Sequence, residues 1–293
     1  MNYAARVSAL AKINLTLRVL GKRRDGYHDL RTTFQSVALH DTLTIRRERG
    51  PFRLECGDPD CPCDRTNLIW RAAEAAWTAA GRRGAPRDVV VALVKRIPIA
   101  AGLGGGSSDA AAALAAFARL WRVDRAAVPA LAASLGADVP YFLEGGTVLG
   151  LERGDLLFPL IDYPSRWVTL VIPGFRVSTK DAYAWFDRDT RAVARAFQAS
   201  GRRRFQASGV RTQGNDLERP VGRRHPDIPR IVAGLRRAGA LDAAMTGSGS
   251  AVFALFDRRA SAARAAVELA RSTRHTLVTR TVSRDEYRVL AGK

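Results

Sequence analysis

The sequence predicts an α+β fold in two domains, and three observations support this prediction. The 293 residues suit one large or two medium domains, at about 100–200 residues each. A strand rich in β-branched residues, VVVALVKRI, leads directly into a glycine loop and an alanine-rich helix. The last part of the chain is predicted as helix, strand, strand, helix and strand, an order typical of an α+β sandwich. The turn IDYPSR marks a boundary, which predicts domains of 1–163 and 164–293.

The composition excludes several other classes of protein. A hydrophobic fraction of 47% excludes disorder of the whole chain. No run of about 18 uncharged apolar residues is present, so we expect no membrane partner. The first residues lack the pattern of a signal peptide, so we expect a cytoplasmic protein. The net charge of +19 keeps RNA binding as an alternative, but arginine is spread along the whole chain, and we expect no nucleic-acid partner.

The first half of the chain is predicted as strands followed by helices. Residues 6–20 alternate loosely and end in the polar stretch GKRRDGYH, which predicts two strands flanking a long loop. A short strand is expected at 41–45, and the segment GDPDCPCDRTN is predicted as loop. Apolar residues at helical spacing predict a helix over 67–80. A strand over 89–97, a helix ending near Trp121 and a helix over 125–135 follow.

In the second half of the chain, predicted strands and helices alternate more regularly. The basic segment 201–214 has no apolar periodicity and is predicted as an exposed loop. The remaining predicted elements are strands at 147–151, 167–173, 240–245, 251–256 and 275–282, and helices over 178–199, 227–238 and 259–272.

Three cysteines, Cys56, Cys61 and Cys63, lie close together in the sequence. An odd number in a chain of this length argues against a disulfide framework. Their clustering raises the alternative of a zinc site, but no histidine lies nearby and the spacing matches no standard zinc pattern. We therefore expect free thiols.

The segment 98–109, PIAAGLGGGSSD, is the most informative part of the chain. Its four glycines remove Cβ atoms, so backbone N–H groups can converge on an anion. The helix that follows offers free N–H groups and its positive dipole end to the same anion. Ser107 and Ser108 can cap this helix or donate to a phosphate. The loop lacks the lysine of a Walker A motif and the spacing of a dinucleotide fingerprint, and a turn without a ligand is the alternative.

Other short motifs are ambiguous when taken one at a time. TGSGS, residues 246–250, suits a tight hairpin. Lys12 in an apolar strand is usually a surface residue, and Asp138 suits a turn or a helix cap.

Taken together and in order, these pieces resemble the GHMP small-molecule kinases. The motifs that carry the resemblance are AKINLTL, GKRRDGYHDLRTTFQ, PIAAGLGGGSSDAAAAL, LGADVPYFL and MTGSGSAVFALF, and they span about residues 9 to 256. The resemblance implies an N-terminal α/β domain like one found in a ribosomal protein and a ferredoxin-like C-terminal α/β sandwich. The active site would lie in the cleft between them.

The resemblance also implies an enzyme that transfers phosphate from ATP to an alcohol. The implied acceptor is 4-diphosphocytidyl-2-C-methyl-D-erythritol, phosphorylated on its 2-hydroxyl in the non-mevalonate route to isoprenoids; a GHMP kinase for another alcohol is the alternative. Mg²⁺ is expected with ATP, with Ser108 as its suggested protein ligand. A monomer or a homodimer is expected. The ATP phosphates would lie against Pro98, Ile99, Ala100, Ala101, Gly102, Leu103, Gly104, Gly105, Gly106, Ser107 and Ser108.

Two residues match the family's catalytic pair. Asp138 would accept the proton of the attacking hydroxyl. Lys12 would hold the hydroxyl and offset charge on the phosphoryl oxygens. Asn14 lies two residues further along the same strand, so it shares the face of Lys12 and can orient the acceptor.

The motif GYH resembles the family's cytidine site. Tyr27 offers a flat face on which a pyrimidine can stack, and His28 can form a hydrogen bond with the edge of the base. Tyr183 is the expected second aromatic wall.

Overall fold

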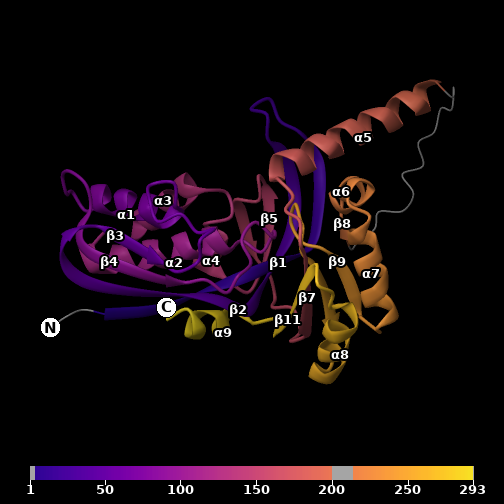
Figure 1. Ribbon diagram of the computed structural model, residues 1–293. Helices are drawn as coiled ribbons and strands as arrows, with labels where there is room; N and C mark the ends of the chain where they lie inside the picture. The colour runs from indigo at the N-terminus through magenta and orange to yellow at the C-terminus, as the bar shows by residue number, and fades with distance from the viewer. Residues whose placement is uncertain (1–3, 200–213, 293) are drawn as a thin grey trace.

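Two β-sheets organise the computed structural model, which describes residues 4–199 and 214–292 (Figure 1). The larger sheet has the strand order β3-β4-β2-β1-β8, with β5 paired to β2 and β6 paired to β5. The smaller sheet has the order β11-β7-β10-β9. The predicted exposed loop 201–214 lies outside the described residues, except for Gly214.

The larger sheet and its helices form the N-terminal body. Alanine-rich helices α1 and α2 pack closely on one another and on the sheet, because small side chains let backbones approach. The strands are β1 (Ala4–Lys22), β2 (His28–Pro51), β3 (Arg53–Cys56), β4 (Arg87–Val94), β5 (Thr147–Glu152), β6 (Leu156–Pro159) and β8 (Gly214–Asn215). The helices are α1 (Leu68–Ala79), α2 (Gly105–Trp121), the short 3₁₀ helix η1 (Arg125–Ala127), α3 (Val128–Leu135) and α4 (Tyr141–Glu144).

Helix α1 confirms the helical spacing predicted over 67–80. Asn67 caps it, because its side chain accepts a hydrogen bond from the backbone N–H of Ile69 at 2.9 Å. Its buried face holds the apolar residues on which the prediction rested, Ile69, Ala72, Ala73, Ala76 and Trp77.

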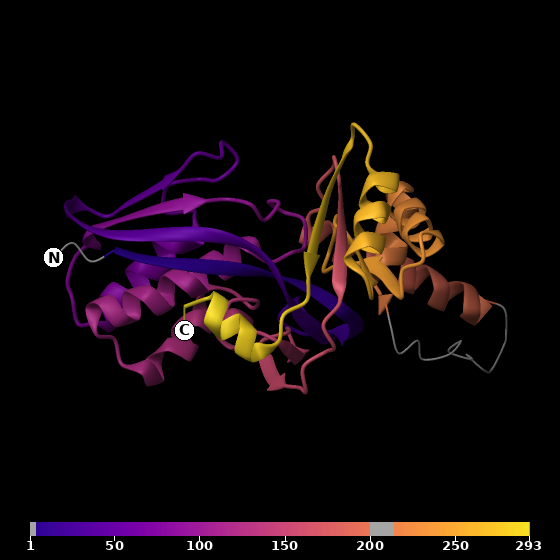
Figure 2. The same ribbon diagram turned by 90° about the horizontal axis from the view of Figure 1, so that it is seen from below.

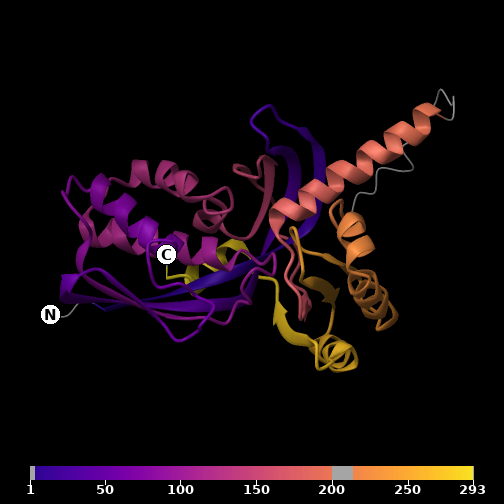
Figure 3. The ribbon, with the colours of Figure 1, turned by 45° about the horizontal axis from the view of Figure 1, so that its top comes forward.

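The prediction of a separate strand at 41–45 was wrong, because these residues belong to β2, which has 24 residues. Strands β1 and β2 form one long antiparallel hairpin across the turn 23–27. Register shifts at Leu10/Ala11, Asn14/Thr16 and Val19/Gly21 bend the pair. The shifts also interrupt the alternation of apolar residues, which hid the length of β2 in the sequence. The hairpin extends from the larger sheet to the side of α5 (Figure 3).

The C-terminal body has the predicted sandwich topology. Its strands are β7 (Trp167–Pro173), β9 (Asp242–Met245), β10 (Val252–Phe256) and β11 (Arg274–Arg280), and its helices are α5 (Thr179–Ala199), α6 (Glu218–Arg224), α7 (Asp227–Arg237) and α8 (Arg259–Leu269). All strand pairs in this sheet are antiparallel. The first strand of the body lies beside the last, which is the ferredoxin-like arrangement.

An apolar cluster that includes residues of the glycine loop joins the two bodies. Ile97, Ala101 and Leu103 of the loop are buried there against residues of β1, β7 and β10. The last helix, α9 (Arg284–Leu290), returns to the N-terminal body (Figure 2), where the Tyr287 hydroxyl donates to the Phe142 carbonyl at 2.7 Å. The division at 163/164 stays a prediction, and this returning helix crosses it.

The three cysteines are free thiols, as predicted. Cys63 is exposed, while Cys56 and Cys61 are partly buried. Among the described residues, no helix is both long and apolar enough to cross a membrane.

Candidate active site

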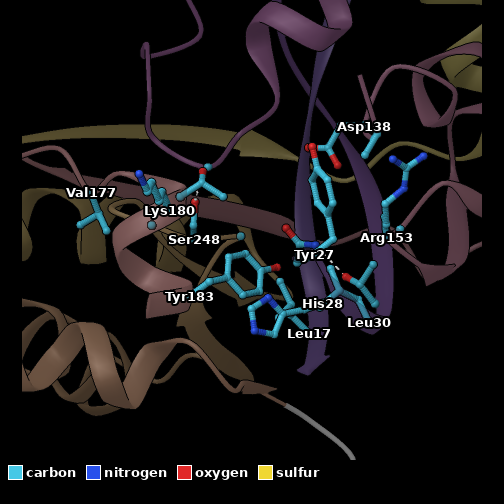
Figure 4. Close-up of a pocket in the computed structure, with 18 of the residues that line it drawn as sticks. Leu17, Tyr27, His28, Leu30, Asp138, Arg153, Val177, Lys180, Tyr183 and Ser248 are labelled. Carbon is cyan, nitrogen blue, oxygen red and sulfur yellow. Dashed lines mark hydrogen bonds between the residues drawn. The ribbon is translucent and has the colours of Figure 1, made fainter. Parts of the chain in front are cut away.

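A cleft of about 1280 Å³ opens where the two bodies meet. Its walls come from the β1–β2 hairpin, the glycine loop, the segment before α4, the start of α5 and the loop between β9 and β10 (Figure 4). Ten predicted site residues line it: Lys12, Asn14, Tyr27, His28, Ala100, Gly102, Gly104, Ser107, Asp138 and Tyr183. The other predicted loop residues lie outside its lining: Pro98, Ile99, Ala101, Leu103, Gly105, Gly106 and Ser108.

The glycine loop has the shape of an anion cradle. Gly102 and Gly104 have φ angles of +80° and +73°, which favour glycine. An added Cβ would lie 2.4 Å from the Thr246 carbonyl oxygen at Gly102, and 2.6 Å from the Phe142 ring at Gly104. No described side chain caps the N-terminus of α2, so its first N–H groups and its dipole remain available to a phosphate.

The loop between β9 and β10 is a hairpin connection that also forms part of the cleft, through Gly247, Ser248 and Gly249. It is locked to the glycine loop, because the Ala251 N–H donates to the Ala101 carbonyl at 3.1 Å. Thr246 was missed as a residue that supports the site from outside the cleft lining. Its hydroxyl accepts from the Asn14 N–H at 3.0 Å, and its place directly before the glycine-rich run 247–249 was the available signal.

Lys12 is the buried cation of the site, with 3% of its surface exposed. Its Nζ donates to Asn14 Oδ1 at 2.7 Å and to the Gly102 carbonyl at 2.9 Å. Asp138 Oδ2 lies 3.9 Å from Nζ, and the Asp138 side chain is 38% exposed. Burial lowers the pKa of Lys12, and the charge of Asp138 opposes this shift only in part. The expected pair is therefore brought together, with its carboxylate open to the cleft.

Asn14 shares the face of Lys12, as predicted, and its amide is held from both sides. Its Nδ2 donates to Thr32 Oγ1 at 2.7 Å, while its Oδ1 accepts from Lys12. These bonds fix the orientation of the amide.

The predicted cytidine residues form the aromatic end of the cleft, where the turn between β1 and β2 meets α5. Tyr183 on α5 stacks on His28, with ring centroids 4.8 Å apart and planes at 21°. Tyr27 is 59% exposed, and the Arg153 guanidinium lies 5.5 Å from its ring centre. All three aromatic side chains line this part of the cleft (Figure 4), and Tyr183 contacts His28 directly.

Two charged residues at this end were missed from the sequence. Asp187 Oδ1 lies 2.7 Å from His28 Nε2, and Lys22 Nζ donates to Asp187 Oδ2 at 2.8 Å. Burial alone would raise the pKa of Asp187, but the hydrogen bonds from Lys22 and His28 lower it overall. A signal was available, because Asp187 lies four residues after Tyr183 on a predicted helix and so shares its face.

A second lysine with a buried side chain, Lys95, follows β4 and lies beside the glycine loop. Lys95 pairs with Asp41 and, at 2.8 Å, with Asp109. Asp41 also accepts from the backbone N–H groups of Arg96 and Ile97. Desolvation raises the pKa of Asp109 to about 7. This cluster positions the strand-to-loop junction and lies outside the cleft lining.

The residues near the loop suit a Mg²⁺ ion that arrives with a nucleotide. No three His, Cys, Asp or Glu side chains group to hold a metal within residues 4–199 and 214–292. Mg²⁺ commonly binds through one or two protein groups together with substrate phosphates, and Asp138 and Ser107 line the cleft. The Ser108 hydroxyl instead donates to the Leu10 carbonyl at 2.7 Å and is buried, which does not favour it as a ligand.

Comparison with known proteins agrees with this geometry. Residues 67–146 match the GHMP kinases N terminal domain, and residues 183–274 match the GHMP kinases C terminal domain. A 4-diphosphocytidyl-2-C-methyl-D-erythritol kinase of Pelotomaculum thermopropionicum is 42% identical over 279 residues, which cover 93% of this chain and 96% of the relative. The kinase of the same name from Moorella thermoacetica is 41% identical, over 94% of this chain and 98% of the relative.

A solved structure of a kinase of this kind also matches the chain. The crystal structure of 4-(cytidine 5'-diphospho)-2C-methyl-D-erythritol kinase matches with a TM-score of 0.75 and 36% identity, covering 94% of this chain and 99% of that chain. The predicted α+β fold with two GHMP kinase bodies is thereby confirmed. The chain belongs to the GHMP kinase family, among the 4-diphosphocytidyl-2-C-methyl-D-erythritol kinases.

Proposed function

We propose that the protein transfers the γ-phosphate of ATP to the 2-hydroxyl of 4-diphosphocytidyl-2-C-methyl-D-erythritol. One observation carries the proposal. A single cleft places Lys12 and Asp138, 3.9 Å apart, between a glycine cradle and a group of aromatic side chains. The cradle suits the phosphates of ATP, and the aromatic end suits a pyrimidine. The names of the relatives support the same acceptor.

The side chains of the cleft suggest a direct transfer without a covalent enzyme intermediate. Asp138 is half-exposed and takes the proton of the acceptor hydroxyl as its oxygen attacks the γ-phosphorus. Within residues 4–199 and 214–292, Asp138 is the one carboxylate that pairs with Lys12, so Lys12 can stabilise negative charge on the transferred phosphoryl group. Asn14, fixed by Thr32 and Lys12, orients the hydroxyl. Mg²⁺ would supply neutralisation of the phosphate charge, and the Ser107 side chain, which lines the cleft, would help to hold it.

A coupled assay of ADP release tests this proposal. Wild type should turn over Mg-ATP with the cytidylylated acceptor, and not with methylerythritol 4-phosphate or homoserine. Asp138→Asn should lower kcat by roughly 10²–10⁴-fold, and Lys12→Met by roughly 10²–10³-fold. Asp285→Asn is the matched control, because this exposed acid lies on α9, away from the cleft, and it should retain full activity.

The outcomes separate the parts of the proposal. Full activity in Asp138→Asn would remove the base assignment and leave the kinase. Turnover of homoserine but not of the cytidylylated acceptor would favour the alternative, a GHMP kinase for another alcohol.

A further inference from the structure

Asp187 joins the two bodies at the aromatic end of the cleft. It lies on α5 and accepts from His28 at the start of β2 and from Lys22 at the end of β1. Its side chain is 18% exposed. Tyr183, one helical turn earlier, covers the face of the same imidazole. Helix α5 therefore holds the His28 ring both in plane and from above.

This contact determines which nitrogen of His28 carries the proton. An ionised carboxylate can only accept hydrogen bonds, so Nε2 must be the donor to Asp187. Lys22 pairs with the other carboxylate oxygen of Asp187, which leaves the oxygen near His28 to accept from the ring. A neutral imidazole with its proton on Nε2 carries a lone pair on Nδ1. Within residues 4–199 and 214–292, Nδ1 has no hydrogen-bond partner, and His28 lines the cleft.

We propose that Asp187 is a positioning residue that makes His28 select cytosine over uracil, an inference that rests on the proposed function. Cytosine presents an amino donor at its 4-position, whereas uracil presents a carbonyl acceptor there. A His28 ring fixed as an acceptor at Nδ1 can accept from the amino group and opposes the carbonyl. Without Asp187 the imidazole can move its proton to Nδ1 and donate to uracil.

A purely structural role for Asp187 makes a different prediction. If the contact only held α5 against the β1–β2 hairpin, its loss would weaken the binding of cytidine and uridine acceptors equally. The ratio of the two specificity constants therefore distinguishes selection of the base from support of the fold.

The kinetic test compares the cytidylylated acceptor with its uridylylated analogue. Wild type should prefer the cytidine form, and Asp187→Ala should reduce that preference by about tenfold, the effect of one mispaired buried hydrogen bond. The change should appear in KM for the acceptor, with kcat and KM for ATP nearly unchanged. Asp189→Ala is the matched control, because Asp189 also anchors α5, through Arg223 and Arg224, but lies outside the cleft lining.

An unchanged cytidine preference in folded Asp187→Ala would overturn the inference, as would an equal loss of selectivity in Asp189→Ala. The ¹⁵N shifts of the imidazoles test it without any turnover, since the chain has only four histidines. They should show His28 protonated at Nε2 and free at Nδ1 in the wild type, and a proton on Nδ1 there would refute the inference.

The two proposals can fail separately. If wild type used neither acceptor, the proposed function would fail. Titration of wild type with CDP and UDP would still test base selection, and equal affinities would overturn it. Should Asp187→Ala fail to fold, this titration and the ¹⁵N shifts of the wild type decide the question.

Discussion

Among the described residues, Lys12 and Lys95 have buried side chains with opposite surroundings. Lys12, in the cleft, has one carboxylate at 3.9 Å, and that carboxylate is half-exposed. Lys95, beside the glycine loop, contacts two carboxylates that are themselves buried. Burial lowers the pKa of Lys12. Burial also acts to lower the pKa of Lys95, but Asp109 and Asp41 raise it overall.

The difference separates the charge that we propose to be functional, on Lys12, from a structural one, on Lys95. Asp41 and Asp109 fully compensate the charge of Lys95, so this residue has nothing to offer a ligand. Lys12 keeps an incompletely paired charge and bonds otherwise to neutral oxygens, those of Asn14 and Gly102. Such a site binds an anion well because it is poorly satisfied without one.

The largest effects are expected when each of the two lysines is replaced by methionine, in the variants Lys12→Met and Lys95→Met. Lys12→Met should lose roughly 10²–10³-fold in kcat and remain folded. Lys95→Met leaves two buried carboxylates without a cation and should lose about 3–5 kcal/mol of stability. Paired measurements of ADP release and urea unfolding check both variants. Lower stability in Lys12→Met than in Lys95→Met would reverse the assignment of the two roles.

The next largest effect concerns Asp41, one of the two carboxylates that contact Lys95. Asp41→Ala removes one partner of Lys95 and leaves the N–H groups of Arg96 and Ile97 without an acceptor. The free energy of unfolding should fall by about 3 kcal/mol. Urea denaturation of Asp41→Ala beside the wild type at pH 7 measures this loss. A change below 0.5 kcal/mol, roughly the level of a surface substitution, would show that the cluster does not hold the loop junction.

Asp109 should behave differently, and its effect depends on pH. Its pKa is raised from 3.8 to about 7, so between these values the native state holds a proton that the unfolded chain releases. The stability of the wild type should therefore fall as the pH rises from about 4 to about 7. Asp109→Asn removes that proton equilibrium and should flatten the fall. Unfolding at pH 5 and pH 8 measures it, and parallel losses in the two proteins would contradict the raised pKa.

The sequence predicts the proposed catalytic lysine, Lys12, and misses the structural one, Lys95, for a physical reason. Lys12, the glycine loop and Tyr27 lie in short linear motifs that keep their meaning without the fold. The contact between Lys95 and Asp41 joins residues 54 positions apart, and that between His28 and Asp187 joins residues 159 apart. Such pairs exist only once the hairpin and α5 are placed. The two-body architecture was predictable because its strand and helix order is local, whereas the length of β2 was hidden by its bulges.

The smallest expected effect concerns the stability of Lys12→Met and tests the contrast most directly. A residue retained for function should cost stability, because its charge is buried with little compensation. Methionine fills a similar volume and needs no charge partner. Lys12→Met should therefore raise the free energy of unfolding by up to about 1 kcal/mol at pH 7, although Asn14 and Gly102 each lose a donor.

The pH dependence of the stability gained in Lys12→Met shows whether the buried charge of Lys12 causes the gain. The pKa of Lys12 is lower in the native state than its ordinary value of 10.5, so between the two values the unfolded chain holds more protons. The stability of the wild type therefore rises with pH in this alkaline range, while that of Lys12→Met does not. The gain should be larger at pH 7 than at pH 9.5 and should disappear as the pH approaches 10.5, and urea unfolding at these two pH values measures it. A gain that stays constant with pH would mean that packing, and not the buried charge, distinguishes Lys12 from Lys95.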